Sequence, residues 1–213
     1  MNKPEASDVV WNVPNIISTM RLVTSIGVFA LIPLGYYYAA LVVFLVSAGT
    51  DWIDGWWARR FNQVTKLGRV LDPFCDKVLI CGTFILLAIE MNGRFPWYAT
   101  IAGWMAVVVV ARELLVTAIR SIIEGGGGDF SAKMAGKLKM WFQCIAVGAA
   151  LLALAWLPVS TSLKSTEIVT PTWLLVVMTI SNWTAILSTL WSGWGYLRAA
   201  APSLGFGRPK SAE

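Results

Sequence analysis

Residues 51–76 of the chain read DWIDGWWARRFNQVTKLGRVLDPFCD. Four of the chain's twelve acidic residues lie in these 26 positions: Asp51, Asp54, Asp72 and Asp76. Asp51 and Asp54 are three residues apart, and Asp72 and Asp76 are four apart. A helical backbone therefore places each pair on one face of its helix. A short loop between the pairs would fold the second helix back beside the first, so the stretch predicts two adjacent helices whose four carboxylates converge.

The composition around this stretch is typical of a membrane protein. Of 213 residues, 57% are apolar and 14% are charged, and the mean hydropathy is +0.65. A soluble domain has about 45–50% apolar and about 25% charged residues. These values exclude a water-soluble enzyme and a free nucleic-acid-binding protein. Because one membrane span takes about 20 residues, the chain has room for about six spans and no separate soluble domain.

Apolar runs separated by Pro, Gly and polar residues predict an all-α integral membrane protein with six transmembrane helices. The predicted spans are Asn12–Pro33, Tyr36–Arg60, Pro73–Met91, Trp97–Ile123, Ala132–Leu157 and Pro171–Arg198. We predict that Asp72 caps the third span and that Pro73 lies in its first turn. Residues 1–198 should form a single transmembrane domain, and residues 199–213 a disordered tail.

The distribution of basic residues predicts the orientation of these spans. Fifteen of the seventeen Lys and Arg residues fall on the side that holds both termini, and only Arg94 and Lys164 fall on the other side. Cytoplasmic loops carry an excess of Lys and Arg, so both termini and the acidic stretch are expected in the cytoplasm.

The four aspartates also predict a metal site. Histidine is absent from the chain, so any metal must be bound mainly by carboxylates. Converging carboxylates repel one another unless cations neutralise them. Two Mg²⁺ or Mn²⁺ ions on shared carboxylates could hold the attacking and leaving oxygens of a phosphoryl displacement. The alternative is that these acids serve as helix caps and as ion-pair partners of Arg59, Arg60, Lys66 and Lys77.

The motif D-x-x-D-G-x-x-A-R, eight residues, G-x-x-x-D-x-x-x-D resembles the signature of the CDP-alcohol phosphotransferases, and each fixed position is present here. The resemblance implies the fold of that family and a magnesium-dependent enzyme that displaces CMP from a CDP-linked lipid with an alcohol. It implies that Asp51, Asp54, Asp72 and Asp76 bind two metal ions and that Asp76 is also the base. It further implies a CDP site formed by Asp51, Gly55, Ala58, Arg59, Gly68 and Asp72, and a homodimer.

A second group of charges suggests where the acceptor alcohol binds. Arg112 lies well inside a predicted span, where an uncompensated charge is costly. Arg112 and Arg120 are about two helical turns apart, and Lys133 and Lys137 are one turn apart on the next span, near Lys139. These five residues predict a basic pocket for a second phosphate. The alternative is that they only fix the membrane topology.

The same segment also resembles one branch of the family. Its pattern A-R-E, then R, then G-K-x-K and Q is similar to phosphatidylglycerophosphate synthases, whose acceptor is sn-glycerol 3-phosphate. A bacterial inner membrane and CDP-diacylglycerol as donor are implied by this branch. Residues 14–21, PNIISTMR, also resemble the P-N-x-x-T-x-x-R segment of this branch. Three residues depart from the branch: Ser18 and Met140 stand where threonine is usual, and Cys75 stands where alanine is usual. Another acceptor, such as an inositol phosphate or phosphatidylglycerol, is therefore the alternative, and a cation transporter is a more remote one.

Overall fold

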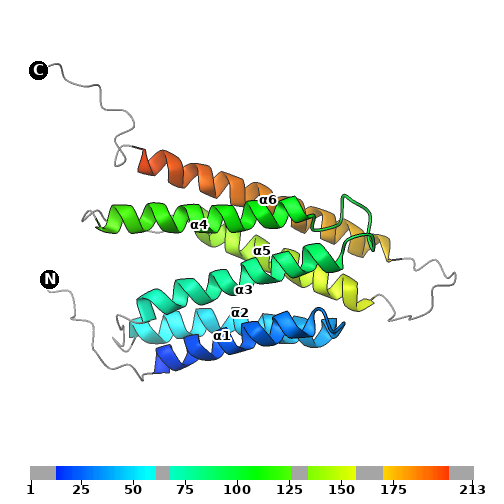
Figure 1. The fold of residues 1–213 in the computed structure, drawn as a ribbon, viewed down its shortest axis with the longest axis horizontal. Helices are drawn as coiled ribbons and strands as arrows, with labels where there is room; N and C mark the ends of the chain where they lie inside the picture. Colours follow the sequence, from blue (N-terminus) through cyan, green and yellow to red (C-terminus); the bar gives the residue numbers. More distant parts are fainter. Residues whose placement is uncertain (1–12, 61–67, 126–133, 157–169, 202–213) are drawn as a thin grey trace, which may run out of the picture.

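The computed structural model of the chain describes residues 13–60, 68–125, 134–156 and 170–201. Every regular element in these residues is an α-helix. The helices are α1 (Val13–Leu31), α2 (Tyr37–Arg60), α3 (Gly68–Glu90), α4 (Gly103–Gly125), α5 (Met134–Trp156) and α6 (Thr172–Ala200) (Figure 1). The prediction of an all-α chain with six helices is confirmed for the described residues.

Four helices begin within two residues of the predicted starts, and two begin five or six residues away. α3 starts at Gly68, five residues before Pro73, so the prediction that Asp72 caps this helix is wrong. The missing N–H of Pro73 removes one backbone hydrogen bond near the start of the helix, and the helix tolerates that loss. α4 starts at Gly103 and not at Trp97, because the residues before it form turns in which the Thr100 hydroxyl donates to the Pro96 carbonyl at 2.9 Å.

The helices form two packed groups that share one core. α1 packs against α2 and α3, while α5 packs against α6 and α2, and α4 contacts both α3 and α6 (Figure 1). Large apolar side chains such as Phe44, Phe84 and Leu151 are fully buried between them. α5 also buries Ala146 and Ala153, and such small residues let neighbouring helices approach closely.

The described starts of α1, α3 and α5 and the described ends of α2, α4 and α6 lie at one end of the bundle (Figure 1). We call it the aspartate end, because the backbone positions of Asp51, Asp54, Asp72 and Asp76 lie on the α2 and α3 segments there. At the opposite end, Gly35 and Gly93 adopt φ values of 78° and 73°, which other residues rarely adopt. The chain reverses tightly at these two glycines.

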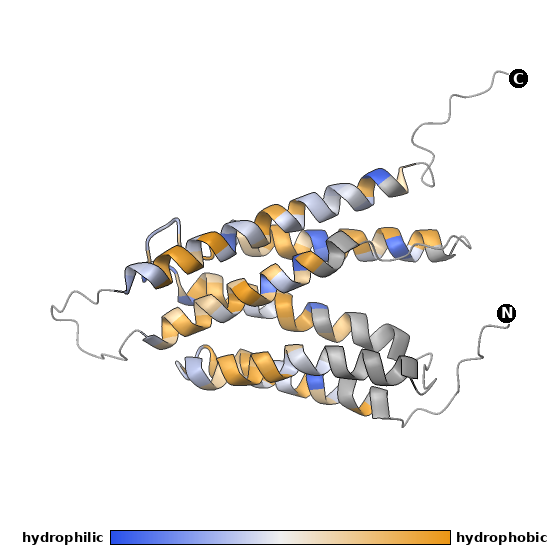
Figure 2. Cartoon of the chain, turned by 180° about the vertical axis from the view of Figure 1, so that it is seen from behind, coloured by the Kyte–Doolittle hydropathy of each residue, from blue (hydrophilic) through white to orange (hydrophobic). Residues whose placement is uncertain are grey.

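Hydrophobic residues are frequent along the helices (Figure 2). Large apolar residues such as Leu34, Val107 and Trp191 are more than half exposed. Among the described residues, Leu138–Trp156 and Thr172–Arg198 are long and apolar enough to cross a membrane. α4 is 23 residues long, but it carries Arg112, Glu113 and Arg120. An extensive exposed apolar surface is typical of a protein that is surrounded by lipid.

Candidate active site

The structure places the backbones of the predicted donor-site residues on two consecutive helices. Asp51, Asp54, Gly55, Ala58 and Arg59 lie in the last ten residues of α2. Asp72 and Asp76 lie in the first nine residues of α3, which begins with Gly68. Both segments are helical, so the spacing argument for one-faced aspartate pairs applies to the observed backbone.

The side chains of these residues lie outside the described part of the structure. The described side chains contain no group of three or more His, Cys, Asp or Glu residues that could hold a metal. This finding does not cover the four aspartates, because their side chains are not described. Convergence of their carboxylates, and the CDP site beside them, therefore remain predictions.

A described cluster of charges lies where α4, α5 and α6 meet. Arg112 Nη1 donates to Glu113 Oε1 at 3.1 Å, and Lys139 Nζ donates to the same oxygen. The three residues are only 9%, 7% and 6% exposed, respectively. Burying a charge is costly unless it is paired, so Glu113 stabilises both cations. The structure thus brings together Arg112 from α4 and Lys139 from α5.

α6 supplies contacts to this cluster that sequence reasoning missed. The Ser192 hydroxyl accepts a hydrogen bond from Arg112 Nη2, and the Tyr196 ring centroid lies 5.4 Å from the Arg112 guanidinium carbon. One turn before Ser192, the Thr189 hydroxyl pairs with Gln143 Nε2 of α5 at 3.0 Å. The polar residues Thr189, Ser192 and Tyr196 recur at i, i+3 and i+7, and this stripe on an apolar helix was the available signal.

Two arginines of α4 keep buried donors without partners. Nε of Arg112 and Nε of Arg120 are buried, and neither has a hydrogen-bond partner in the part of the chain that the structure describes. A buried donor that lacks a partner costs free energy. In addition, Glu113 is the only described carboxylate paired with Arg112 and Lys139, so one of their two charges is not balanced within the described residues. Both features suit an anionic ligand.

The remaining predicted acceptor residues are less closely defined. Arg120 lies eight residues after Arg112 on α4, which corresponds to about 12 Å along the helix. Ile119 and Ile123, on either side of it, form a small separate cluster with Ala200 of α6. Lys133 and the side chain of Lys137 lie outside the described residues, so their part in the pocket remains a prediction.

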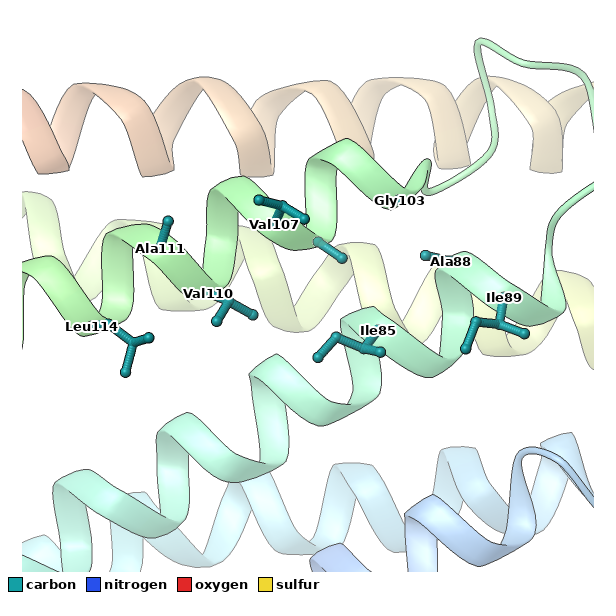
Figure 3. Close-up of a pocket in the computed structure, with 9 residues that line it drawn as sticks. Ile85, Ala88, Ile89, Gly103, Val107, Val110, Ala111 and Leu114 are labelled. Atoms are coloured by element: carbon teal, nitrogen blue, oxygen red, sulfur yellow. The ribbon is translucent and has the colours of Figure 1, made fainter.

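An apolar groove of about 480 Å³ runs between α3 and α4 (Figure 3). Its lining includes Ile85 and Ile89 of α3 and Val107, Val110 and Leu114 of α4. These side chains offer no charged or hydrogen-bonding group to a phosphate. We therefore place the candidate active site at the aspartate end and at the buried charges, and not in this groove.

Comparison with known proteins agrees with the family resemblance of the aspartate motif. Residues 11–191 match the family model described as CDP-alcohol phosphatidyltransferase. A protein of Bacillus subtilis (strain 168), named CDP-diacylglycerol–glycerol-3-phosphate 3-phosphatidyltransferase, is 33% identical over 75% of this chain and 72% of its own length. Proteins of the same name from Shigella flexneri serotype 5b and Escherichia coli K12 are 31% and 30% identical over 91% of this chain and 97% of theirs.

Proposed function

Because the chain belongs to the CDP-alcohol phosphatidyltransferase family, we propose that it transfers the phosphatidyl group of CDP-diacylglycerol to sn-glycerol 3-phosphate. The products would be phosphatidylglycerophosphate and CMP. The relatives named above support this acceptor by their names. The structural observation that carries the acceptor assignment is the buried pair of cations, Arg112 and Lys139, with an unused guanidinium donor. Family membership also favours an enzyme over a cation transporter.

The donor half of the reaction is assigned to the aspartate end. Asp51, Asp54, Asp72 and Asp76 would hold two Mg²⁺ or Mn²⁺ ions, since carboxylate oxygens are the ligands that these ions prefer. The helical backbone at all four positions is compatible with this ligand set. Bound metal would neutralise the negative charge of the pyrophosphate. Arg59 would add a charge-assisted contact to a phosphate, while Gly55, Ala58 and Gly68 leave room for the nucleotide.

Asp76 has a separate proposed role as the base. It would accept the proton of the attacking hydroxyl of glycerol 3-phosphate as that oxygen bonds to the phosphorus bearing the diacylglycerol, with CMP as the leaving group. Arg112, Lys139, Arg120, Lys133 and Lys137 would bind the phosphate of the acceptor and so fix its distance from Asp76.

We place this chemistry at the cytoplasmic face of a bacterial inner membrane, with all six helices spanning the bilayer and both termini in the cytoplasm. The exposed apolar surface and the excess of basic residues on one side support this arrangement. The acyl chains of the donor would then remain in the lipid while the headgroup reaches the aspartates. A homodimer is part of the same proposal, and nucleic acid is not an expected partner.

The test is CMP release by the detergent-purified protein with CDP-diacylglycerol and Mg²⁺. sn-Glycerol 3-phosphate, inositol 1-phosphate and phosphatidylglycerol are offered separately as acceptors. We expect CMP release with glycerol 3-phosphate and none with the other two acceptors. Turnover only with another acceptor would overturn the acceptor assignment, while no turnover with any acceptor, despite cation flux into liposomes, would overturn the enzyme assignment.

A further inference from the structure

α6 holds Arg112 through three neighbouring positions. Ser192 Oγ accepts from Arg112 Nη2, and the Tyr196 ring packs against the guanidinium with 5.4 Å between the ring centroid and the guanidinium carbon. Gly193 lies so close that a Cβ atom there would be 3.3 Å from Arg112 Cγ. Ser192 and Tyr196 are 1% and 3% exposed, so these contacts are shielded from the surroundings.

The contact of Ser192 differs from those of the other two serines on the same helix. Ser188 Oγ donates to the Ala185 carbonyl at 2.9 Å, and Ser181 Oγ donates to the Met178 carbonyl at 3.1 Å. Hydroxyls in helices commonly make such bonds to the preceding turn. Ser192, in contrast, contacts the charged side chain of a residue 80 positions away on α4. Its hydroxyl therefore has a role between helices that the other two do not have.

These contacts leave the guanidinium of Arg112 with a defined orientation. Nη1 is bound to Glu113 and Nη2 to Ser192, whereas the buried Nε–H has no partner within the described residues. A guanidinium is planar and rigid, so fixing both terminal nitrogens also fixes the direction of its remaining N–H groups. A donor whose direction is fixed in advance loses less entropy when it binds an anion.

We propose that Ser192 is a positioning residue for the acceptor substrate, which acts by holding Arg112 in the orientation that binds the acceptor's phosphate. The inference rests on the proposed function and extends the acceptor site from α4 and α5 to α6. It predicts that the CDP-lipid site does not depend on Ser192, because the aspartates lie on α2 and α3. Tyr196 and the absence of a side chain at Gly193 support the same orientation.

The test measures KM for each substrate and kcat for Ser192→Ala, with Ser188→Ala as the matched control. Ser188 lies one turn away on the same helix and bonds only to its own helix carbonyl among the contacts that the structure describes. We expect Ser192→Ala to raise the KM for glycerol 3-phosphate roughly tenfold, which corresponds to about 1.4 kcal/mol. The KM for CDP-diacylglycerol and the melting temperature should stay close to those of the wild type. Equal changes in both KM values, or an unchanged acceptor KM, would overturn the proposal.

A double-mutant cycle separates positioning from general packing. If Ser192 acts through Arg112, then Ser192→Ala should have little further effect on acceptor KM in an Arg112→Lys background. A full additional increase in that background would overturn the proposal. Gly193→Ala provides an independent test, because its Cβ would displace Arg112 by a few tenths of an ångström, whereas a Cβ at Gly195 meets nothing within 4 Å. We expect an increased acceptor KM for Gly193→Ala and none for Gly195→Ala, and the same KM for both would contradict the proposal.

The wild-type protein distinguishes failure of this inference from failure of the proposed function. Turnover of glycerol 3-phosphate by the wild type, with an unchanged KM in Ser192→Ala, overturns only the role of Ser192. Turnover of a different phosphorylated alcohol overturns the acceptor assignment, and the same variants are then compared with that alcohol. A wild type that uses no phosphorylated acceptor overturns both.

Discussion

Two clusters of the described structure, one in the interior of the bundle and one at the end opposite the aspartates, each contain a carboxylate that is shared between two donors, but the two clusters differ in burial and in charge balance. In the interior of the bundle, Glu113 pairs with Arg112 and Lys139, and all three residues are at most 9% exposed. At the opposite end, Glu90 accepts from Tyr37 at 2.9 Å and from Arg94 at 3.0 Å, and the Arg94 side chain is 46% exposed.

The difference shows how charged residues that only link two helices can be distinguished from a candidate binding site. Arg94 and Glu90 balance each other in charge, and Arg94 also donates to the Tyr37 hydroxyl at 2.9 Å, so this cluster links α2 to the end of α3. Among the described residues, the buried cluster has two cations for one carboxylate, and the Nε–H of Arg112 has no partner. A protein gains little stability from such an arrangement, so we attribute it to ligand binding.

The largest effect is expected from a variant that removes the proposed base at the aspartate end. Asp76→Asn should lower kcat by about 10³-fold or more, because it removes both a proton acceptor and a metal ligand. CMP release under saturating substrates measures this loss, and size-exclusion chromatography reports folding. Glu90→Gln, the matched change at the opposite end, should keep nearly normal turnover. A folded Asp76→Asn variant with near-normal activity would refute the assignment.

The next effect concerns the stability that each shared carboxylate contributes. Glu113→Ala leaves Arg112 and Lys139 buried without their common partner, and we expect the free energy of unfolding to fall by about 3–5 kcal/mol. Glu90→Ala should cost less than about 1 kcal/mol, because Arg94 reaches solvent. Thermal and denaturant unfolding in the same detergent measure both values. Similar losses for the two variants would remove the distinction between the clusters.

The KM values of the two substrates should distinguish the buried cluster from the donor site. Arg112→Ala should raise the KM for glycerol 3-phosphate by about 10- to 100-fold, the range expected for the loss of a hydrogen bond to a charged group. The KM for CDP-diacylglycerol should change far less, since the predicted CDP residues lie on α2 and α3. Initial rates at varied concentrations of each substrate give both constants. Parallel increases in the two would argue against separate sites.

The smallest effect is expected for Arg94→Ala. Its pair with Glu90 spans one helical turn and is partly exposed, so its loss should lower stability by about 0.3–1 kcal/mol and leave both KM values unchanged. Unfolding curves at low and high salt provide the measurement, because salt screens a partly exposed pair. A clear fall in turnover would show that this end also takes part in the reaction.

The sequence was sufficient to predict the six helices, because apolar runs and their boundaries are local features, whereas the donor site on α2 and α3 stays a prediction. Apolar runs and the positions of Pro and Gly predicted six helices, most of them within a few residues of their observed ends. Pro73 misled the prediction for α3, since proline is tolerated near the start of a helix as well as at its first position.

The acceptor site depended instead on contacts between distant helices. Glu113 could be suggested as a partner of Arg112 because the two are adjacent in sequence. Ser192 lies 80 residues from Arg112, and Thr189 lies 46 residues from Gln143. No local pattern specifies which helices pack together, so the part played by α6 became visible only in the fold. For Arg120, in contrast, the sequence predicted a place in the pocket, but the structure shows no hydrogen-bond partner for its Nε among the described residues.

The adjacency of Arg112 and Glu113 also matters for how the protein is made. Synthesis proceeds from the N-terminus, so α4 is complete before Lys139, 26 residues after Glu113, and Ser192, 80 residues after Arg112, have been added. During that interval the arginine has a carboxylate one residue away on its own helix. If α4 spans the bilayer as proposed, this pairing would lower the cost of inserting Arg112, and the cluster would gain its second cation only when α5 is added.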